Sequence, residues 1–220
     1  AQEGAPPFEL VVLDNSPEGS ALEVARRLAA EAPFPVRIGH EPNPGVANAR
    51  NAALRLAAGA IIAFLDDDQT APPTWLKSLE ATRLAFAADV VFGPCVGVTP
   101  PNTPHADYLR TFLERAGPKT SGPVTRAWGI GNSYLVRARA LPAAAPFDAG
   151  TNETGGEDDV LFAGLLAAGA RFAWSAEGFV YEHGLPERMT LKHAQRRAFA
   201  YVQGPAETAA RARPPQVLTL

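Results

Sequence analysis

Short apolar runs and longer amphipathic runs alternate along the first 98 residues, and this order constrains the fold more than any other feature. Strands are predicted at 8–13, 36–40, 60–65 and 89–98, and helices at 20–32, 47–58 and 71–87. Such alternation is typical of an α/β protein, in which helices cover a mostly parallel sheet. Ligands of these sheets bind beyond the carboxyl ends of the strands, so the residues that follow each strand are candidate site residues.

Local signals predict where the helices begin and end. Ser20 with Glu23 three residues later has the pattern of a capping box, so the first helix should start there. Gly59 should end the second helix. The prolines at 72 and 73 suit the first turn of the third helix.

The second half of the chain is less regular. Loops are predicted at 99–104 and 117–128, and helices at 106–115, 157–168 and 190–202. Three strands are predicted: one at 132–136, one that follows the helix 157–168 and ends at residue 174, and one at 179–184. Residues 1–204 are expected to form a single domain with halves at 1–98 and 99–204. Residues 205–220 are expected to be a tail.

Composition excludes several classes of protein. A net charge of −3 provides no overall positive field that would attract nucleic acid. The single cysteine, Cys95, excludes a disulfide within the chain and a cysteine-rich zinc site, and is expected to be a buried small residue. The longest apolar run, 160–170, is shorter than the roughly 20 residues that a membrane-spanning helix needs.

Three consecutive aspartates, Asp66, Asp67 and Asp68, follow the apolar strand at 60–65. At an extended strand end Asp66 and Asp68 would share one face, and Asp67 would point away. Two carboxylates with the same orientation offer hard oxygen ligands for Mn²⁺ or Mg²⁺. A solvated acidic turn, or caps for the next helix, would explain the same residues without a metal.

A second acidic group, Glu157, Asp158 and Asp159, follows two glycines and opens an apolar helix. The helix dipole favours acids there by about 0.3–1 kcal/mol each, which accounts for them without any function. A carboxylate on a glycine-rich turn is also suited to be a general base. His183 could be a third metal ligand or an ordinary surface histidine. Arg50 could bind phosphate or a base edge, or be an ordinary surface arginine.

Six stretches together resemble the family 2 glycosyltransferases, which have the Rossmann-like GT-A fold. They are FELVVLDNS, NPGVANARNAAL, IIAFLDDDQTAPPTWL, WGIGNSYLVRARAL, FDAGTNETGGEDDVLFAGLLAAG and VYEHGLPERMTLKHAQRRAF. Each is weak alone, but they occur in the family's order and at its usual spacing from residue 8 to about 204. The resemblance implies an inverting transfer of a sugar from a nucleotide-diphosphate sugar, above all a UDP-sugar, to an acceptor hydroxyl.

The resemblance also implies roles for individual residues. Contacts with the nucleotide and the donor would be made by Asp14, Asn15, Arg50, Asp66 and Asp67. Mn²⁺ or Mg²⁺ on the diphosphate would be bound by Asp68, together with Asp66 and His183. Asp158, beside Glu157, would be the catalytic base, and the loop 129–132 would lie near the sugar and the acceptor.

Two departures from the family pattern lead to further expectations. The family has another strand and helix before the strand at 8–13, so we expect the natural gene product to continue upstream of Ala1. Without that central strand, hydrogen-bonding edges would stay open. Asp159 is an additional acid beside Glu157 and Asp158, so the base could lie one position further along.

Other functions stay open on the sequence alone. A nucleotidyltransferase of similar fold also needs aspartates and Mg²⁺, and a non-catalytic module could bind a nucleotide or glycan without turnover. The acceptor could be a polysaccharide or other glycan, a lipid-linked sugar or a protein. The basic amphipathic helix at 190–202 either packs on the domain or lies on a membrane surface. The expected location is the cytoplasm, with peripheral contact at the inner face of the membrane as the second possibility.

Overall fold

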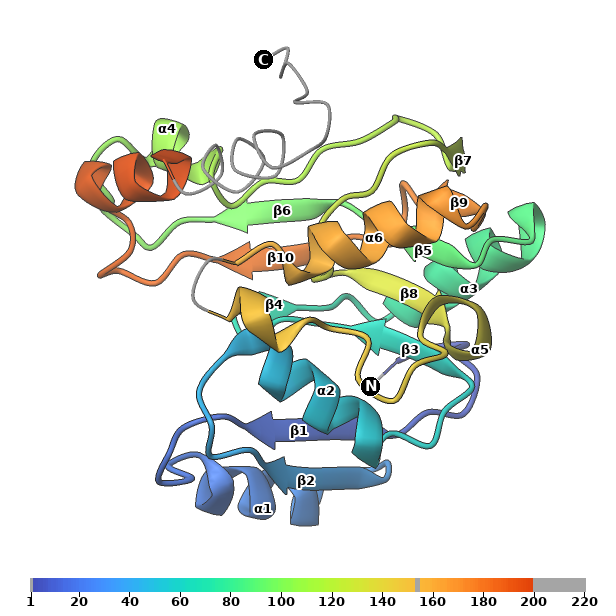
Figure 1. Ribbon diagram of the computed structural model, residues 1–220. Coiled ribbons are helices and arrows are strands. Elements are labelled where there is room, and N and C mark those ends of the chain that lie inside the picture. Colours follow the sequence, from blue (N-terminus) through green and yellow to red (C-terminus); the bar gives the residue numbers. More distant parts are fainter. Residues whose placement is uncertain (1, 153–154, 200–220) are drawn as a thin grey trace.

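The computed structural model describes residues 2–152 and 155–199 of the chain (Figure 1). The strands are β1 Leu10–Asp14, β2 Val36–His40, β3 Ile61–Phe64, β4 Gln69–Thr70, β5 Val90–Phe92, β6 Cys95–Val98, β7 Gly122–Val124, β8 Ser133–Val136, β9 Phe172–Trp174 and β10 Val180–His183. The helices are α1 Leu22–Glu31, α2 Val46–Leu56, α3 Trp75–Phe86, α4 Ala106–Arg110, α5 Arg137–Ala140 and α6 Glu157–Ala167, with the 3₁₀ turn η1 Ala149–Thr151. Residues 191–199 are also helical.

The strands form three sheets, and the largest is mixed. Its order is β3-β8-β5-β9-β7, beside the pair β1-β2 and the three strands β4-β10-β6. β1 and β2 are parallel, whereas β8 is antiparallel to both of its neighbours, β3 and β5. The α/β class is confirmed, and β3 and β5 point in the same direction as each other. They are not adjacent, because β8 from the second half of the chain lies between them.

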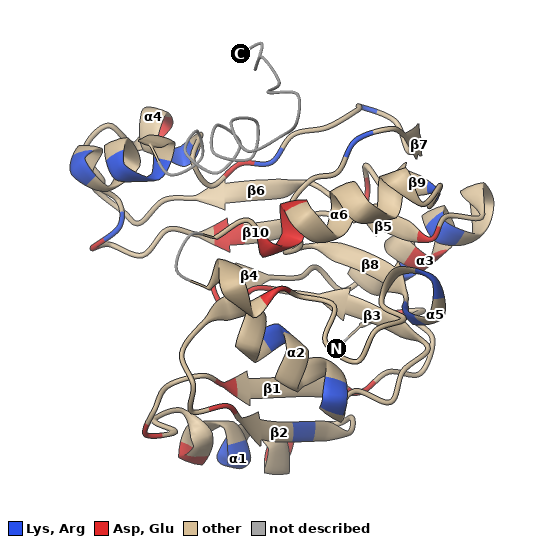
Figure 2. Cartoon of the chain, in the orientation of Figure 1, with Lys and Arg blue, Asp and Glu red and all other residues tan. Residues whose placement is uncertain are grey.

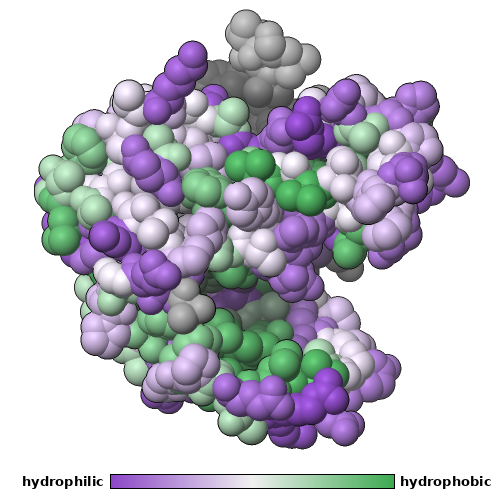
Figure 3. Space-filling model, turned by 180° about the vertical axis from the view of Figure 1, so that it is seen from behind, coloured by the Kyte–Doolittle hydropathy of each residue, from purple (hydrophilic) through white to green (hydrophobic). Residues whose placement is uncertain are grey.

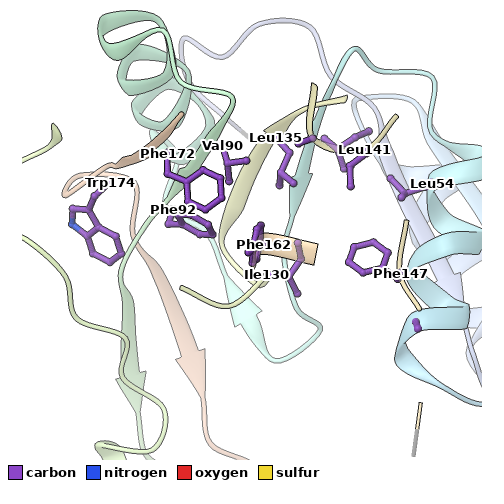
Figure 4. Packing of buried hydrophobic residues seen from close by; sticks show 13 residues of the cluster. Leu54, Val90, Phe92, Ile130, Leu135, Leu141, Phe147, Phe162, Phe172 and Trp174 are labelled. Carbon is purple, nitrogen blue, oxygen red and sulfur yellow. The ribbon is translucent and has the colours of Figure 1, made fainter. Parts of the chain in front are cut away.

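Side chains alternate between two cores across the five-stranded sheet. Val90 and Phe92 of β5 belong to a cluster that includes Phe162 of α6, whereas Val91 between them belongs to a cluster with Leu79 of α3. Figure 4 shows the first cluster, in which Phe92 packs edge-to-face against Phe162. Helices therefore cover both faces of this sheet, which explains why its strands read as continuous apolar runs.

The ends of two predicted helices are different in the structure. The capping box at Ser20 is wrong, because α1 starts at Leu22 and its N-cap residue, Ala21, donates its N–H to Asp14 Oδ2 at 2.6 Å. A carboxylate at the end of β1 therefore satisfies this helix terminus. The prolines at 72 and 73 precede α3, which starts at Trp75, rather than lying in its first turn.

The predicted strand at 89–98 is divided into β5 and β6, which belong to different sheets. The break falls at Gly93 and Pro94, where a Cβ on Gly93 would lie 2.0 Å from the Gly178 carbonyl oxygen. Further along, α4 ends at Arg110 rather than Arg115, and β7 lies within the predicted loop at 117–128. Strand β4 and helix α5 were not predicted.

Strands β1 and β3 each keep one edge that pairs with no strand in residues 2–152 and 155–199. They point the same way in Figure 1, and Figure 3 shows a hollow with apolar lining between the β1–β2 lobe and the rest of the molecule. Apolar side chains of this lobe stay accessible: Leu10, Val24 and Leu28 are 42%, 48% and 59% exposed.

The helix at 191–199 packs on the region of α4 through one face. Ala194 and Met189 form a small buried cluster with Leu109 and Leu113, while Leu191 is 50% exposed. The predicted end of this helix at 200–202 and the predicted tail at 205–220 lie outside the described residues. Across the described ranges, every helix is too short or too polar to cross a bilayer.

Candidate active site

The three aspartates lie in a turn between β3 and β4 rather than at an extended strand end. The N–H of Gln69 donates to the carbonyl oxygen of Asp66 at 3.0 Å and closes this turn. Asp67 is exposed, whereas Asp66 and Asp68 are partly buried. The predicted separation of the outer aspartates from the middle one is therefore present, although a turn produces it.

Strand β10 brings His183 to the aspartate turn. The backbone N–H of His183 donates to the carbonyl oxygen of Asp68 at 2.8 Å. The ring nitrogen Nε2 of His183 lies 2.8 Å from the Thr70 hydroxyl. Two of the three predicted metal ligands are therefore on neighbouring segments, and the imidazole has a protein partner.

A buried glutamine, Gln69, connects the turn to β10. Its Oε1 accepts the N–H of Asp66 at 3.1 Å, and its Nε2 donates to Glu182 Oε2 at 3.3 Å. The pKa of the Glu182 carboxyl is raised, first of all by burial. The hydrogen bond from Gln69 opposes this rise, and the charge of Asp68 adds to it. Neither Gln69 nor Glu182 was singled out from the sequence, where only their position beside candidate ligands marks them.

Whether these residues can hold a metal ion depends on the other ligands that the ion would have. In the part of the chain that the structure describes, no three His, Cys, Asp or Glu side chains group closely enough to hold one. Mg²⁺ is often bound by one or two carboxylates and completed by substrate phosphates. Asp66 and Asp68 fit that pattern, and Nε2 of His183 would become available to an ion only if the ring left Thr70.

The loop 129–131 lies between the aspartate turn and the start of α6. A Cβ on Gly131 would come within 2.0 Å of Asp66 Oδ2, and a Cβ on Gly129 within 3.2 Å of Asp158 Oδ2. Asp158 Oδ2 also accepts the N–H of Ile130 at 3.0 Å. The two acidic groups predicted from the sequence therefore contact the same loop, whose glycines permit the approach.

Asn132 fixes the end of this loop. It is fully buried and has a φ of 56°, a conformation that asparagine tolerates better than most residues. Its Oδ1 accepts from Trp75 Nε1 at 2.7 Å, and its Nδ2 donates to the carbonyl oxygens of Pro94 at 2.8 Å and Gly178 at 2.9 Å. One side chain therefore satisfies three polar groups of other segments and holds the loop in place.

Replacing Gly131 with alanine should displace either the loop or the Asp66 side chain. A methyl group would overlap Asp66 Oδ2, and overpacking of this kind typically costs about 1–3 kcal/mol. Urea denaturation would measure the loss in the free energy of unfolding. Gly122→Ala is the matched control, because a Cβ there would meet no atom within 4 Å. Equal stability of the two variants would contradict the contact.

Helix α2 carries Arg50 to the start of α6, where it pairs with Glu157. Arg50 Nη1 donates to Glu157 Oε1, and the two side chains are 16% and 7% exposed. The guanidinium also lies 5.6 Å from the ring centroid of Phe147. Arg50 was predicted at the nucleotide and Glu157 beside the base, and the structure joins them. Of the acids at this helix start, Asp158 contacts the loop 129–131, while Asp159 is exposed.

A distant asparagine caps α2. Asn152, which follows η1, accepts the N–H of Ala47 on Oδ1 at 2.9 Å. Gly45, the residue before the helix, has a φ of 134° and passes so close to Asn152 that a Cβ would lie within 2.3 Å of it. This contact was not predicted, because the two segments are far apart in the sequence.

The side-chain oxygens of Asp14 are used within the chain. They accept the N–H of Ser16 at 2.8 Å, the hydroxyl of Ser16 at 2.7 Å and the N–H of Ala21. These bonds, with the Ser16 N–H first, lower the pKa of the Asp14 carboxyl. The side chain of Asn15 donates to the carbonyl oxygens of residues 41 and 43 and accepts the N–H of residue 45. Contact of either residue with a nucleotide stays a prediction.

The predicted site residues gather on one side of the molecule. Figure 2 shows acidic segments at the end of β1, near β4, on β10 and at the start of α6, with a basic segment of α2 among them.

Beside the loop 129–131 is an open cavity of about 530 Å³, lined by residues 116–118, 123–126 and 128. Within it, the Arg126 guanidinium lies 4.4 Å from the Trp128 ring centroid.

Solved structures identify the class of the fold. S. aureus TarS 1–349 in complex with UDP superposes with a TM-score of 0.63 at 18% sequence identity, over 97% of this chain and 66% of that one. The complex of the same protein with UDP-GlcNAc gives a TM-score of 0.63 at 18% identity, over 92% and 59% of the two chains. The chain has the fold of the GT-A glycosyltransferases.

Sequence comparison gives the family. The family model of Glycosyl transferase family 2 matches residues 1–135. The chain is 30% identical to the succinoglycan biosynthesis protein ExoM of Rhizobium meliloti strain 1021 over 192 residues, which are 87% of this chain and 62% of ExoM. It is 35% identical to a validoxylamine A glucosyltransferase of Streptomyces hygroscopicus subsp. jinggangensis over 117 residues, 51% of this chain and 26% of that one. The chain belongs to glycosyl transferase family 2, and it spans less than two thirds of ExoM.

Proposed function

We propose that the chain forms the catalytic part of a metal-dependent, inverting glycosyltransferase that uses a UDP-sugar. The observation that carries this proposal is the contact of Asp66 and Asp158 with the same loop, at Gly131 and Gly129. Membership of the family supports sugar transfer. The neighbours solved with UDP and UDP-GlcNAc support the class of donor.

In an inverting transfer, the acceptor oxygen attacks the anomeric carbon from the face opposite to the diphosphate. The bond between that carbon and the phosphate oxygen breaks, and its electron pair leaves with the nucleoside diphosphate. The acceptor hydroxyl gives its proton to a base. In this proposal the base is Asp158, which Ile130 N–H holds against the loop, while Glu157 is occupied by Arg50.

The proposed metal site is the aspartate turn. Asp68, with Asp66 and His183, would hold Mn²⁺ or Mg²⁺, and the ion would stabilise negative charge on the departing diphosphate. The protein's own part is to hold the turn against β10, which it does through the pairs Gln69–Glu182 and Thr70–Tyr181. Contacts within the chain therefore hold the turn.

Thermal unfolding should identify the nucleotide. UDP at about 100 times its Kd should stabilise the chain by about 2.7 kcal/mol in the presence of Mn²⁺, and by much less without it. GDP, CDP and dTDP serve as comparisons. Asp68→Ala should remove the effect of Mn²⁺, whereas Asp107→Ala, at a side chain that is fully exposed on α4, should retain it.

Each contrary outcome removes a different part of the proposal. Stabilisation by GDP, CDP or dTDP instead of UDP would change the donor class, and equal stabilisation without metal would remove the metal. Binding of UDP without turnover of any UDP-sugar would favour a non-catalytic binding module.

The name of ExoM favours a saccharide acceptor, and a screen for saccharides that accelerate UDP release would test that choice.

A further inference from the structure

Arg115 is a cation of the site that the sequence patterns did not mark. Its backbone is fixed by a pair of hydrogen bonds with Cys95 at the start of β6, at 3.0 and 3.1 Å. Its side chain is partly buried, and Nη1 donates to the carbonyl oxygen of Gly131. Arg115 therefore lies on the loop that contacts both acidic groups.

The guanidinium is placed between those acids. A Cβ on Gly129 would lie 3.3 Å from Arg115 Nη2 and 3.2 Å from Asp158 Oδ2, so the two groups flank the same residue. Gly131, whose carbonyl Arg115 binds, contacts Asp66. Burial raises the pKa of the Asp66 carboxyl, and the charges of Arg50 and then Arg115 oppose that rise.

The two arginines near Asp66 differ in their partners. Arg50 is in a buried ion pair with Glu157. Arg115, in contrast, makes no ion pair within 4.0 Å to any acid of residues 2–152 and 155–199, and its hydrogen bond to Gly131 uses one of the five N–H donors of a guanidinium. A partly exposed cation with unused donors, beside a site made of carboxylates, is suited to an anion that enters with the substrate.

We propose that Arg115 binds the diphosphate of the donor, an inference that rests on the proposed function. A guanidinium can donate two parallel hydrogen bonds to phosphate oxygens, which a neutral side chain cannot do. Its charge would then stabilise the electron pair that moves onto the phosphate oxygen as the bond to the sugar breaks. The competing explanation is that Arg115 only supports the loop through Gly131.

Calorimetric titrations with UDP and with uridine, both in Mn²⁺, separate these explanations. Arg115→Met should weaken UDP binding by about 10- to 100-fold, as expected for loss of hydrogen bonds to a charged group, and should leave uridine affinity within about twofold. Arg115→Lys, which keeps the charge, should recover part of the loss. Arg139→Met is the matched control, because the Arg139 side chain is 68% exposed and faces Asp89 rather than this cluster.

The outcomes also separate this inference from the proposed function. Unchanged UDP affinity in Arg115→Met, or equal losses for UDP and uridine, would overturn the diphosphate contact and leave only support of the loop. Failure of the unsubstituted chain to bind UDP would overturn the proposed function, and the inference with it. If Arg115→Met does not fold, Arg115→Lys must still weaken UDP binding more than uridine binding, and equal affinities would overturn the inference.

Discussion

Replacing Asp158 with asparagine should lower the rate of sugar transfer by about 10²- to 10⁴-fold, the usual contribution of general base catalysis. An asparagine keeps the size of the side chain, and its oxygen can still accept the N–H of Ile130. It cannot take a proton from the acceptor hydroxyl. The affinity for UDP should therefore stay near that of the unsubstituted chain, because the base does not contact the nucleotide in this proposal.

The measurement is the initial rate of UDP release from a donor that the unsubstituted chain turns over, with UDP affinity measured on the same preparation. Asp159→Asn is the matched control, since Asp159 is the exposed neighbour and should retain its rate within about twofold. A large loss in Asp159→Asn with a small loss in Asp158→Asn would transfer the role of base by one position. Equal, small losses in both would remove the catalytic base from this helix.

Features that depend on neighbouring residues could be predicted from the sequence. The alternation of strands and helices gave the α/β class, because the periodicity of a segment reflects which of its faces is buried. The glycines before the second acidic group adopt positive φ values of 73° and 88° and lead directly into α6, which starts at Glu157 as predicted. Asp14 and Asp66 lie at or just beyond the carboxyl ends of β1 and β3, as the sequence predicted, and their place in a functional site stays a prediction.

Features that depend on distant residues could not be predicted in this way. Arg50 and Glu157 are 107 positions apart, and Asn152 caps a helix 105 positions earlier in the chain. No periodicity or spacing in the sequence connects such pairs, which meet only in the folded chain. The capping box failed for a more local reason, since Asp14, seven positions before Ala21, satisfies α1 instead of Ser20.

Breaking the pair of Arg50 and Glu157 should be the most destabilising change at the site. Both side chains are largely buried, so removal of one leaves the other charge without a partner, at a cost of about 3–5 kcal/mol. Urea denaturation of Arg50→Met, Glu157→Met and the double variant would form a double-mutant cycle. The double variant should be more stable than the sum of the two single losses predicts, because it leaves no buried charge unpaired.

An ion pair between Arg55 of the same helix and Glu41 of the preceding loop gives the scale against which this result is judged. Arg55 lies 3.4 Å from Glu41, and the two side chains are 56% and 16% exposed, so Arg55→Met should cost no more than about 1 kcal/mol. Additive losses across the Arg50 and Glu157 cycle would show that each residue acts through packing alone. A strong coupling would instead show that the charge on α2 holds the start of α6, and with it the position from which Asp158 faces the loop 129–131.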